Sequence, residues 1–479
     1  MILKNIVRAV GLAALTSLPL AAQQASTPVR IVTAEDYAHA EKFMTYNTAP
    51  LVLRSGVRPV WIPTTAAEPT VRFWYRVTTE RGPEAIVVNA ATGTQTPCDL
   101  PACTEALRNS GGGGRGGAPA RSADVKSPDG KRTAFVRNWN LWVRDIASGK
   151  ETQLTKDGVK DFGYATDNAG WTTSDRAILL WSPDSKKIAT FQQDQRGVGE
   201  MYLVDTKVGH PTLQAWKYPL PGDPVITMIQ RVVIDVDSGK VVRLQLPPDQ
   251  HRSTLCDDVS CRGEWDDVQW GPDGSKLAFV STSRDHKHEQ LRQADPASGA
   301  VREVLEEKGE TFLESGNGRV SWKFLPASNE VVWFSERDNW GQLYLHDLQT
   351  GREKHQITTG DGNVTQLLRV DEKNRVLYFT AVGREKGRDP YFRHFYRIGM
   401  DGKNLQLLTP ADADHDVSLS PSGTFFVDSF SKPDVPPVTE LRDTDGRLIV
   451  TLEKADISRL VATGWKPPVP VTVKARDGV

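Results

Sequence analysis

Six stretches of the chain repeat one plan, in which a tight turn is followed by an apolar strand and then by further short strands. The turn reads "SPDG" at residues 127–130: Pro fixes φ at its second position, Asp bonds its own backbone, and Gly accepts the left-handed conformation. Related turns place prolines at 128, 183, 272 and 421. With weaker copies between them, the spacing approaches the ~40 to 50 residues of a propeller blade.

The repeats supply short strands, and helical periodicity is confined to residues 34–44, where we expect a short helix. One further copy lies at residues 58–96. The sequence therefore predicts an all-β fold, a β-propeller of about eight blades, with seven as the alternative. The expected organisation is a signal peptide at 1–22, an N-terminal segment at 23–57, the propeller at 58–460 and a final segment at 461–479.

The N-terminus has the pattern of a secretory signal peptide. Lys4 and Arg8 precede an uncharged, mostly apolar run over residues 9–22, and small residues follow it, so cleavage after Ala22 or Ala25 is expected. The run is shorter than the about 20 residues that cross a bilayer, and no later segment is apolar enough to do so. We therefore expect an exported protein, periplasmic or secreted, without a membrane span.

The overall charge argues against a polyanionic partner. The chain has 59 Lys and Arg against 60 Asp and Glu, and its formal net charge is -1. Such a chain has no global field that would draw it to nucleic acid or to an anionic membrane. We expect no nucleic-acid partner.

The four cysteines form two pairs with the same spacing. In an oxidising compartment, this pattern favours two local disulfides, Cys98 with Cys103 and Cys256 with Cys261, and a four-thiolate zinc site is the alternative. His286 and His288 lie on a polar stretch that we interpret as a solvated loop rather than a metal site. No metal and no cofactor are expected.

The sequence contains no Gly-x-Ser-x-Gly motif, the turn that exposes the nucleophile of α/β-hydrolases, and we assign no catalytic residue to this chain. The Gly-rich stretch between Cys103 and Ser127 has neither a strand before it nor a Lys-Ser/Thr that begins a helix after it, so we interpret it as a surface loop rather than a phosphate cradle. At the end of the chain, residues 471–476 alternate in polarity, and Asp477-Gly478 comes next. This pattern predicts a strand that enters a hairpin turn.

Three segments carry a resemblance to a known family: "WSPDSKKIATFQQDQ" at 181–195, "YPLPGDP" at 218–224 and "GREKGRDPYFRHFYRIGMDG" at 383–402. Together with the repeats, they resemble the N-terminal β-propeller of dipeptidyl peptidase IV-type serine peptidases of the prolyl oligopeptidase family. The resemblance runs from about Asp36 to the end of the chain. It implies peptide substrates, a homodimer, and a C-terminal α/β-hydrolase domain that holds the catalytic triad, toward which residues 461–479 would cross.

The resemblance also suggests where a peptide binds. In that family, acidic residues of the propeller, usually a Glu-Glu pair, grip the free ammonium of the substrate, because two carboxylates form charge-assisted hydrogen bonds with it. This chain has "GYATDNAGW" at 163–171 instead, which leaves one carboxylate. The candidate peptide-binding residues are Tyr164, Asp167, Asn168, Trp171, Asp194 and Arg196.

Four of these residues also have an interpretation without a ligand. Asp167 and Asn168 are of the types that cap helices or form turns, and Asp194 and Arg196 are typical of the end of a strand and its hairpin. We interpret Tyr391, His394 and Tyr396 first as residues that pack within a blade and second as residues that line the pore.

The sequence supports two functional hypotheses. In the first, the chain is the propeller that gates access and orients the substrate N-terminus in an exported dipeptidyl peptidase IV-like serine exopeptidase, and this chain alone hydrolyses nothing. In the second, it is a free-standing, non-catalytic periplasmic propeller used for binding or scaffolding. A domain of the second kind needs no partner strand after Val479.

Overall fold

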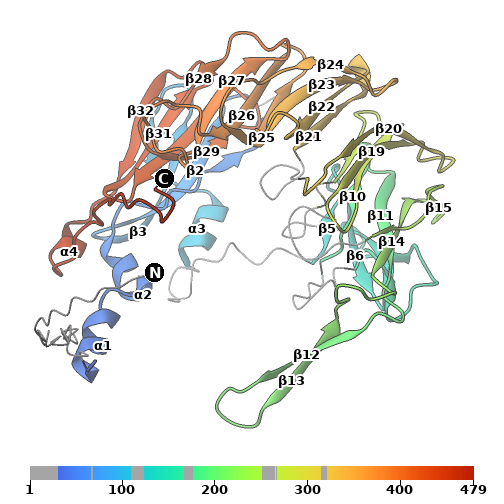
Figure 1. Cartoon of the computed structure of the whole chain (residues 1–479), viewed down its shortest axis with the longest axis horizontal. Coiled ribbons are helices and arrows are strands. Elements are labelled where there is room, and N and C mark those ends of the chain that lie inside the picture. The colour runs from blue at the N-terminus through green and yellow to red at the C-terminus, as the bar shows by residue number, and fades with distance from the viewer. Residues whose placement is uncertain are drawn as a thin grey trace, which may run out of the picture. The chain divides into compact units, whose positions relative to one another are not determined.

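The computed structural model describes residues 31–65, 68–108, 123–166, 176–250, 265, 267–313 and 321–478 (Figure 1). The chain divides into two compact units. The smaller unit comprises residues 1–52 and 458–465, and the larger unit comprises residues 53–457 and 466–479.

The smaller unit is helical in its described part. It contains α1 (Ala34–Glu41), α2 (Thr45–Thr48), the short 3-10 helix η1 (Ala49–Leu51) and α4 (Ser458–Val461), which contacts η1. The expected helix begins at Thr33 with a capping box: Thr33 Oγ1 accepts a hydrogen bond from Asp36 N at 3.2 Å, and Asp36 Oδ2 accepts one from Thr33 N at 2.9 Å. These two bonds satisfy backbone donors that the first helical turn leaves free.

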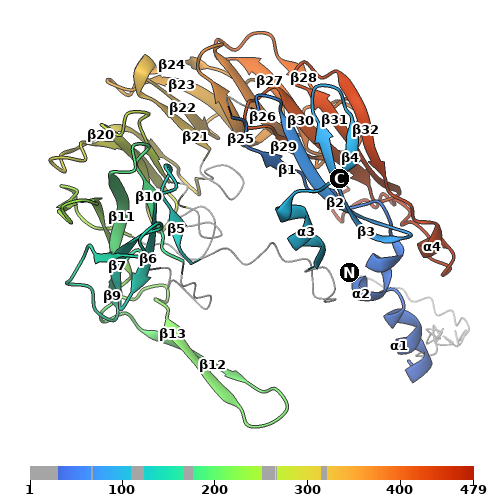
Figure 2. The ribbon, with the colours of Figure 1, turned by 180° about the vertical axis from the view of Figure 1, so that it is seen from behind.

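The larger unit consists of antiparallel sheets, numbered 1 to 7 in chain order (Figures 1 and 2). Sheet 1 contains β1 (Val60–Ile62), β2 (Arg72–Thr79), β3 (Gly82–Asn89) and β4 (Gln95–Pro97); sheet 2 contains β5 (Val125–Lys126), β6 (Arg132–Arg137), β7 (Asn140–Asp145) and β8 (Glu151–Gln153). Sheet 3 contains β9 (Phe162–Tyr164), β10 (Leu180–Trp181), β11 (Lys187–Asp194), β14 (Met228–Asp235), β15 (Val241–Arg243) and β16 (Asp249–Gln250). A separate hairpin, β12 (Glu200–Asp205) with β13 (Thr212–Lys217), is inserted between β11 and β14.

The remaining sheets have four strands each in chain order. Sheet 4 contains β17 (Val268–Trp270), β18 (Leu277–Thr282), β19 (His288–Ala294) and β20 (Val301–Lys308); sheet 5 contains β21 (Trp322–Leu325), β22 (Glu330–Ser335), β23 (Gln342–Asp347) and β24 (Glu353–Gln356), with the 3-10 helix η3 (Pro326–Ser328) after β21. Sheet 6 contains β25 (Asn363–Asp371), β26 (Val376–Val382), β27 (His394–Gly399) and β28 (Gln406–Leu407). Sheet 7 contains β29 (Asp414–Leu419), β30 (Phe425–Lys432), β31 (Val435–Asp443) and β32 (Leu448–Lys454).

The repeated turns join the first two strands of these sheets. In the turn at residues 127–130, Gly130 N donates to Ser127 O at 2.9 Å, and Gly130 has a φ of 71°, which a residue with a Cβ adopts only with strain. Ser127 Oγ donates to Asp129 Oδ1 at 2.6 Å, and Ser182 Oγ donates to Asp184 Oδ1 at the same distance in the next copy. The repeat in the sequence is thus a repeat in structure.

Each hydrophobic cluster of the larger unit is shared by neighbouring sheets. The clusters join sheet 2 to 3, 3 to 4, 4 to 5, 5 to 6, 6 to 7, and 7 to 1. In the last of these, Val427 and Leu441 of sheet 7 pack with Phe73 and Tyr75 of sheet 1. The expected all-β propeller is confirmed, and the described residues form seven sheets of four or more strands. The number of blades stays a prediction.

A polar contact accompanies the packing of the first sheet on the last. Glu453, whose side chain is 3% exposed, accepts a hydrogen bond from Tyr75 Oη at 2.9 Å and from Arg54 Nη1 at 2.9 Å. Burial and the neighbouring Glu453 raise the pKa of Tyr75 above its usual value, so the phenol keeps its proton and donates it. Trp61 Nε1 also donates to Ser418 Oγ at 3.0 Å.

The strand predicted near the end of the chain is wrong. Residues 466–478 contain no strand, and Val471 and Val473 are each 82% exposed. The alternating pattern is present, but a strand needs a neighbour for its backbone hydrogen bonds, and the described residues provide none here.

The first cysteine pair is a disulfide: Cys98 is bonded to Cys103, which lies in α3 (Pro101–Arg108). Cys256 and Cys261 lie outside the described residues. Within the described ranges, no three His, Cys, Asp or Glu side chains are grouped so that they could hold a metal ion, and no helix is long and apolar enough to cross a bilayer.

The contact at Glu453 generates a stability prediction. Tyr75→Phe removes the hydroxyl that donates to this buried carboxylate, so the free energy of unfolding should fall by about 1–2 kcal/mol, measured by urea unfolding. Tyr202→Phe is the control, because Tyr202 is 59% exposed and its loss of a hydroxyl should cost less than about 0.5 kcal/mol. Equal stabilities of the Tyr75→Phe variant and the wild type would show that the contact does not stabilise the fold.

Candidate functional site

In each sheet, the second strand is connected to the third at one end of the sheet. We call this end the hairpin end. Because the strands are antiparallel and follow chain order, the link that leaves the fourth strand departs from the same end. The β12–β13 hairpin extends from the hairpin end of sheet 3, and the loop at residues 383–393 extends from that of sheet 6. Insertions in repeat proteins often carry function on one face, so the hairpin ends are the candidate functional surface.

Tyr164 lies in the core rather than on this surface. It is 1% exposed and belongs to the cluster shared by sheets 2 and 3. Its hydroxyl donates to Asp157 Oδ1 at 2.9 Å and accepts from Arg243 Nη2 at 3.1 Å. Burial and the bond to Asp157 raise the pKa of Tyr164 to about 12. Tyr164 therefore anchors the segment that leads to residue 167 and does not itself face a ligand.

Asp194 and Arg196 form a closed ion pair at the end of β11. Arg196 Nε and Nη2 donate to the two carboxylate oxygens of Asp194 at 2.9 and 2.8 Å, and the guanidinium lies 3.9 Å from the ring centroid of Phe162. The hydrogen bonds from Arg196 hold the pKa of Asp194 below its ordinary value. Because this carboxylate already has a cation, it is poorly suited to grip the ammonium of a peptide.

The other candidates, Asp167, Asn168 and Trp171, lie outside the described residues. The chain is described up to Thr166, which is 8% exposed and donates from Oγ1 to Gln193 Oε1 at 3.1 Å. The last residue described before this gap, Thr166, thus lies beside Gln193 of β11.

Trp139 is a residue of this surface that the sequence reasoning missed. It lies in the turn between β6 and β7, is 39% exposed, and has a φ of 61°, a left-handed conformation that costs a residue with a Cβ about 1–2 kcal/mol. Its carbonyl accepts a hydrogen bond from Tyr164 N at 2.9 Å. A Cβ on Gly163 would lie 3.1 Å from Trp139 Cβ, so Gly163 leaves room for this close approach. A Trp between two Asn in a two-residue hairpin is the signal that could have identified it.

The surface thus offers a half-exposed indole and a guanidinium stacked on a ring. Trp139 supplies an apolar face against which a side chain can pack, and Arg196 supplies N–H donors that a carbonyl can accept from. The Asp194 carboxylate beside them is paired with Arg196. The indole and the guanidinium suit the side chains and carbonyls of a peptide.

The loop at residues 383–393 is held by three arginines. Arg384 Nη2 donates to Thr359 O at 2.7 Å, Arg388 donates to Pro410 O and Ala411 O at 2.9 and 3.1 Å, and Arg393 forms a two-pronged pair with Asp414 at 2.9 and 2.7 Å. Two of the three packing residues expected here, His394 and Tyr396, are each 2% exposed. The interpretation of Tyr391 is wrong: it is 85% exposed at the tip of the loop, because it precedes β27 instead of pairing within it.

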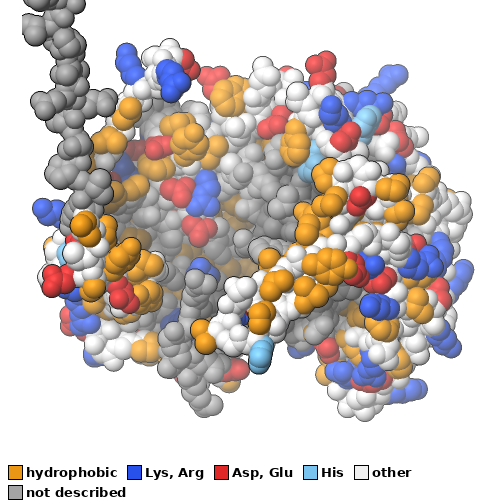
Figure 3. All heavy atoms as spheres, turned by 60° about the horizontal axis from the view of Figure 1, so that its bottom comes forward, with side chains coloured by type: hydrophobic (Ala, Val, Ile, Leu, Met, Phe, Trp, Pro, Cys, Tyr) orange, Lys and Arg blue, Asp and Glu red, His pale blue; other side chains and the backbone are white. Residues whose placement is uncertain are grey.

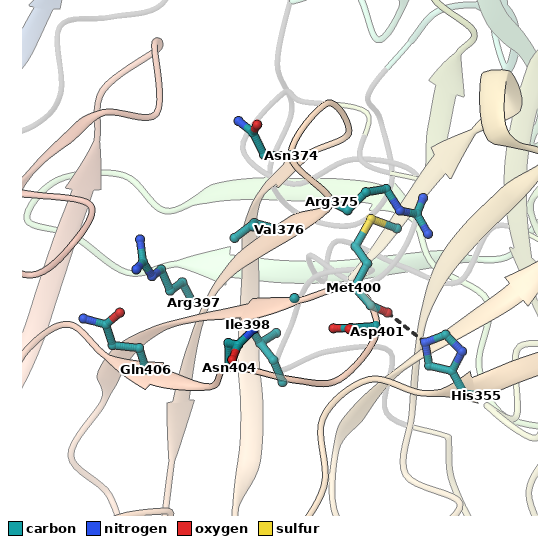
Figure 4. A pocket seen from close by; sticks show the side chains of 11 residues that line it. His355, Asn374, Arg375, Val376, Arg397, Ile398, Met400, Asp401, Asn404 and Gln406 are labelled. Carbon is teal, nitrogen blue, oxygen red and sulfur yellow. Dashed lines mark hydrogen bonds between the residues drawn. The ribbon is translucent and has the colours of Figure 1, made fainter.

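A cavity of about 830 Å³ lies between sheets 5 and 6, away from the hairpin ends (Figure 4). Arg375 and Arg397 both line it but point away from each other, and each binds a neighbouring sheet: Arg375 pairs with Glu330, and Arg397 donates to Asp445 Oδ1 at 2.5 Å. Although Glu330 is buried, its bonds from Arg375 and Lys354 lower its pKa to about 2. Because both guanidiniums are engaged in holding sheets together, this cavity is not an anion site.

The β12–β13 hairpin projects from sheet 3, and hydrophobic side chains gather along it in Figure 3. The exposed apolar residues of the hairpin are Tyr202, Leu203, Val204, Val208 and Leu213. They are between 47% and 109% exposed, so they bury little surface within their own chain. An exposed apolar patch of this kind marks an interaction surface.

Comparisons with known proteins agree with this architecture. Residues 112–437 match the family model described as "Dipeptidyl peptidase IV (DPP IV) N-terminal region". A probable dipeptidyl-aminopeptidase B of Aspergillus oryzae is 25% identical over 347 residues, which cover 65% of this chain and 36% of that protein. A putative dipeptidyl aminopeptidase of Schizosaccharomyces pombe is 28% identical over 351 residues, covering 66% of this chain and 41% of that protein.

Solved structures show the same fold. The dipeptidyl peptidase 4 of Porphyromonas gingivalis superposes with a TM-score of 0.63 at 18% identity, over 87% of this chain and 56% of that chain. A putative dipeptidyl aminopeptidase IV from Bacteroides ovatus gives a TM-score of 0.55 at 20% identity, over 80% and 51%.

The chain belongs to the dipeptidyl peptidase IV N-terminal region family, as the resemblance in the sequence had suggested. It spans well under half the length of the curated relatives it matches, 36% in the first case.

The ion pair at the end of β11 generates a titration prediction. Arg196→Gln removes the donors that stabilise the Asp194 carboxylate, so the pKa of Asp194 should rise toward its ordinary value of 3.8, followed by carboxyl carbon NMR. The control is Arg284→Gln, because Arg284 donates to Pro219 O and not to Asp194. An unchanged Asp194 titration in Arg196→Gln would mean that the pair does not persist in solution.

Proposed function

We propose that the chain is the propeller of an exported dipeptidyl peptidase IV-like serine peptidase, in which it restricts access to the active site and orients the peptide substrate. The observation that carries this proposal is the family match over residues 112–437 in a chain that spans 36% of its first curated relative. Those relatives are named as dipeptidyl aminopeptidases, and their remaining length leaves room for a catalytic domain.

The bond-breaking step then belongs to a C-terminal α/β-hydrolase domain. This chain's sequence has no Gly-x-Ser-x-Gly motif to provide an activated serine. The apolar run at residues 9–22 directs the protein out of the cytoplasm.

The propeller's own part is to position the substrate at the hairpin ends of sheets 2 and 3. Trp139 packs against a substrate side chain, and Arg196 donates to a backbone carbonyl, which together limit the orientations of a bound peptide. Since Asp194 is paired with Arg196, any grip on the substrate ammonium falls to Asp167 and its neighbours.

Purified residues 23–479 provide the test. Incubated with short peptides that have free N-termini, they should release no dipeptide by mass spectrometry, yet calorimetry should detect binding. Trp139→Ala should weaken that binding at least about fivefold, because an exposed Trp in a contact is worth ~1 kcal/mol or more.

Trp340→Ala is the matched control, because Trp340 is also 39% exposed and lies in the corresponding hairpin of sheet 5. Dipeptide release by residues 23–479 alone would contradict the division of labour between the two domains. Unchanged binding in Trp139→Ala, or no binding at all, would contradict the role of this surface and favour a scaffold.

We also propose that the β12–β13 hairpin pairs with the same hairpin of a second copy. Its apolar side chains are exposed on both faces, its outer edges pair with no other described strand, and a two-fold axis lets one self-complementary patch serve both partners. Burying such a patch against its copy removes apolar surface from water without a second kind of partner.

The double variant Leu203→Glu with Leu213→Glu should convert a dimer to a monomer in analytical ultracentrifugation, because paired hairpins would bury these carboxylates. Leu405→Glu is the control, since Leu405 is also exposed, at 46%, but lies in a turn of sheet 6. A monomeric wild type, or a double variant that stays dimeric, would refute the pairing.

A further inference from the structure

Three buried titratable side chains meet where sheets 6 and 7 pack together. His394 begins β27, His415 lies in β29 and Asp428 lies in β30, and each is no more than 2% exposed. The two imidazole rings are 5.0 Å apart between centroids. The family match and the proposed peptidase function assign no role to this cluster, and the chemistry of the cluster does not depend on that function.

The hydrogen bonds of His415 define its protons. Nε2 lies 3.0 Å from Ala411 O, and Nδ1 lies 2.9 Å from both carboxylate oxygens of Asp428. A carbonyl only accepts, so Nε2 must carry a hydrogen. Nδ1 then shares a hydrogen with Asp428, whether it sits on the ring or on the carboxyl. In both arrangements the pair is electrically neutral and holds one proton more than a neutral imidazole beside a carboxylate.

The charged side chains near the pair are bound to other partners, so they do not neutralise Asp428 in place of this proton. From the loop at residues 383–393, Glu385 is bound by Tyr396 at 2.9 Å, Arg388 donates to carbonyls, and Arg393 is paired with Asp414. On β31, Arg442 is paired with Glu440 at 2.7 Å.

His394 adds no charge of its own. Its Nδ1 lies 3.3 Å from Thr409 O, and its Nε2 is buried without a partner among the described residues. Burial and the nearby His415 lower the pKa of His394, which therefore stays neutral. Burial also raises the pKa of Asp428, which favours retention of the shared proton.

The shared proton matters because the cluster holds in place the link between β28 and β29 and the loop at residues 383–393. Ala411 O accepts from His415 Nε2 and also from Arg388 Nη1, so one carbonyl of the link between β28 and β29 joins β29 to the loop at residues 383–393. His415 N donates to Arg393 O at 3.1 Å, and Arg393 N donates to Asp414 Oδ1 at 2.9 Å. This loop and link leave sheets 6 and 7 at the hairpin ends.

We propose that the His415–Asp428 pair is a proton-operated latch that fastens to β29 the link at residues 408–413 and, through the bond from Arg388 to Ala411 O, the loop at residues 383–393. With the proton bound, Ala411 and Asp428 both have a donor. When this proton is lost to solvent, the imidazole keeps one N–H, while Ala411 O and the Asp428 carboxylate both need a donor. Because the buried carboxylate then carries a negative charge, the N–H stays with Asp428 and the bond to Ala411 O opens. The latch is closed at low pH and is released as pH rises, because the closed form binds the extra proton.

The test follows two signals in the wild-type protein from about pH 5 to about pH 9. Histidine labelled with nitrogen-15 should show a proton on His415 Nε2 at the acid end and none at the alkaline end. Over the same interval, hydrogen exchange at the amides of Arg393 and His415, corrected for its intrinsic pH dependence, should become at least about tenfold faster.

Asp428→Asn separates the proton from the packing. An amide is close in shape to the carboxyl and donates to Nδ1 of a neutral imidazole, so the Ala411 bond should persist and protection should become independent of pH. His355→Gln is the matched control: His355 Nε2 also bonds a carbonyl, Met400 O at 2.8 Å, with no carboxylate among the partners described for its ring. It should keep the wild-type pH response.

Three results would overturn the proposal. The first is a His415 Nε2 without a proton at the acid end in the wild type. The second is wild-type protection that stays flat across the interval. The third is an Asp428→Asn variant that folds, by its thermal melt, and still loses protection as pH rises, because the proton would then lie elsewhere.

Discussion

The contact between the first sheet and the last is the constraint on which the rest of the larger unit depends. A four-stranded sheet has two faces, and in the described residues each hydrophobic cluster lies between one sheet and another. Phe73 and Tyr75 of sheet 1 cover Val427 and Leu441 of sheet 7, and Glu453 accepts hydrogen bonds from Tyr75 and Arg54 in the same place. Without this contact both sheets would expose a hydrophobic face to water.

The antiparallel order of the strands then decides where function can lie. It brings the turns between second and third strands to the same end of every sheet as the links between sheets. Three features lie at such ends: the β12–β13 hairpin, the loop at residues 383–393 with Tyr391, and the surface at Trp139 and Arg196. At that end, Asp194 is paired with Arg196 and Asp414 with Arg393. The peptide recognition that we propose there would therefore rest on shape, aromatic packing and N–H donors more than on net charge.

The sequence predicted the fold well, because its information is local and repeated. Turn residues such as Ser127 and Gly130 specify a hairpin without help from distant parts of the chain, and the family resemblance at 181–195 and 383–402 is confirmed. The surroundings of the candidate site residues could not be predicted in this way. Tyr164 is in the core and Asp194 is paired, which are facts of tertiary packing that a list of residue types does not contain. The strand at 471–476 failed for the same reason, since pairing depends on a neighbour.

The intact mass of the protein in the exported fraction of its source cells tests most directly whether the propeller is one part of a larger peptidase. If it is, the mass should lie well above the 52.9 kDa of this chain, even after the signal peptide has been removed. A mass equal to that of residues 23–479 would contradict this claim and would make the chain a free-standing propeller.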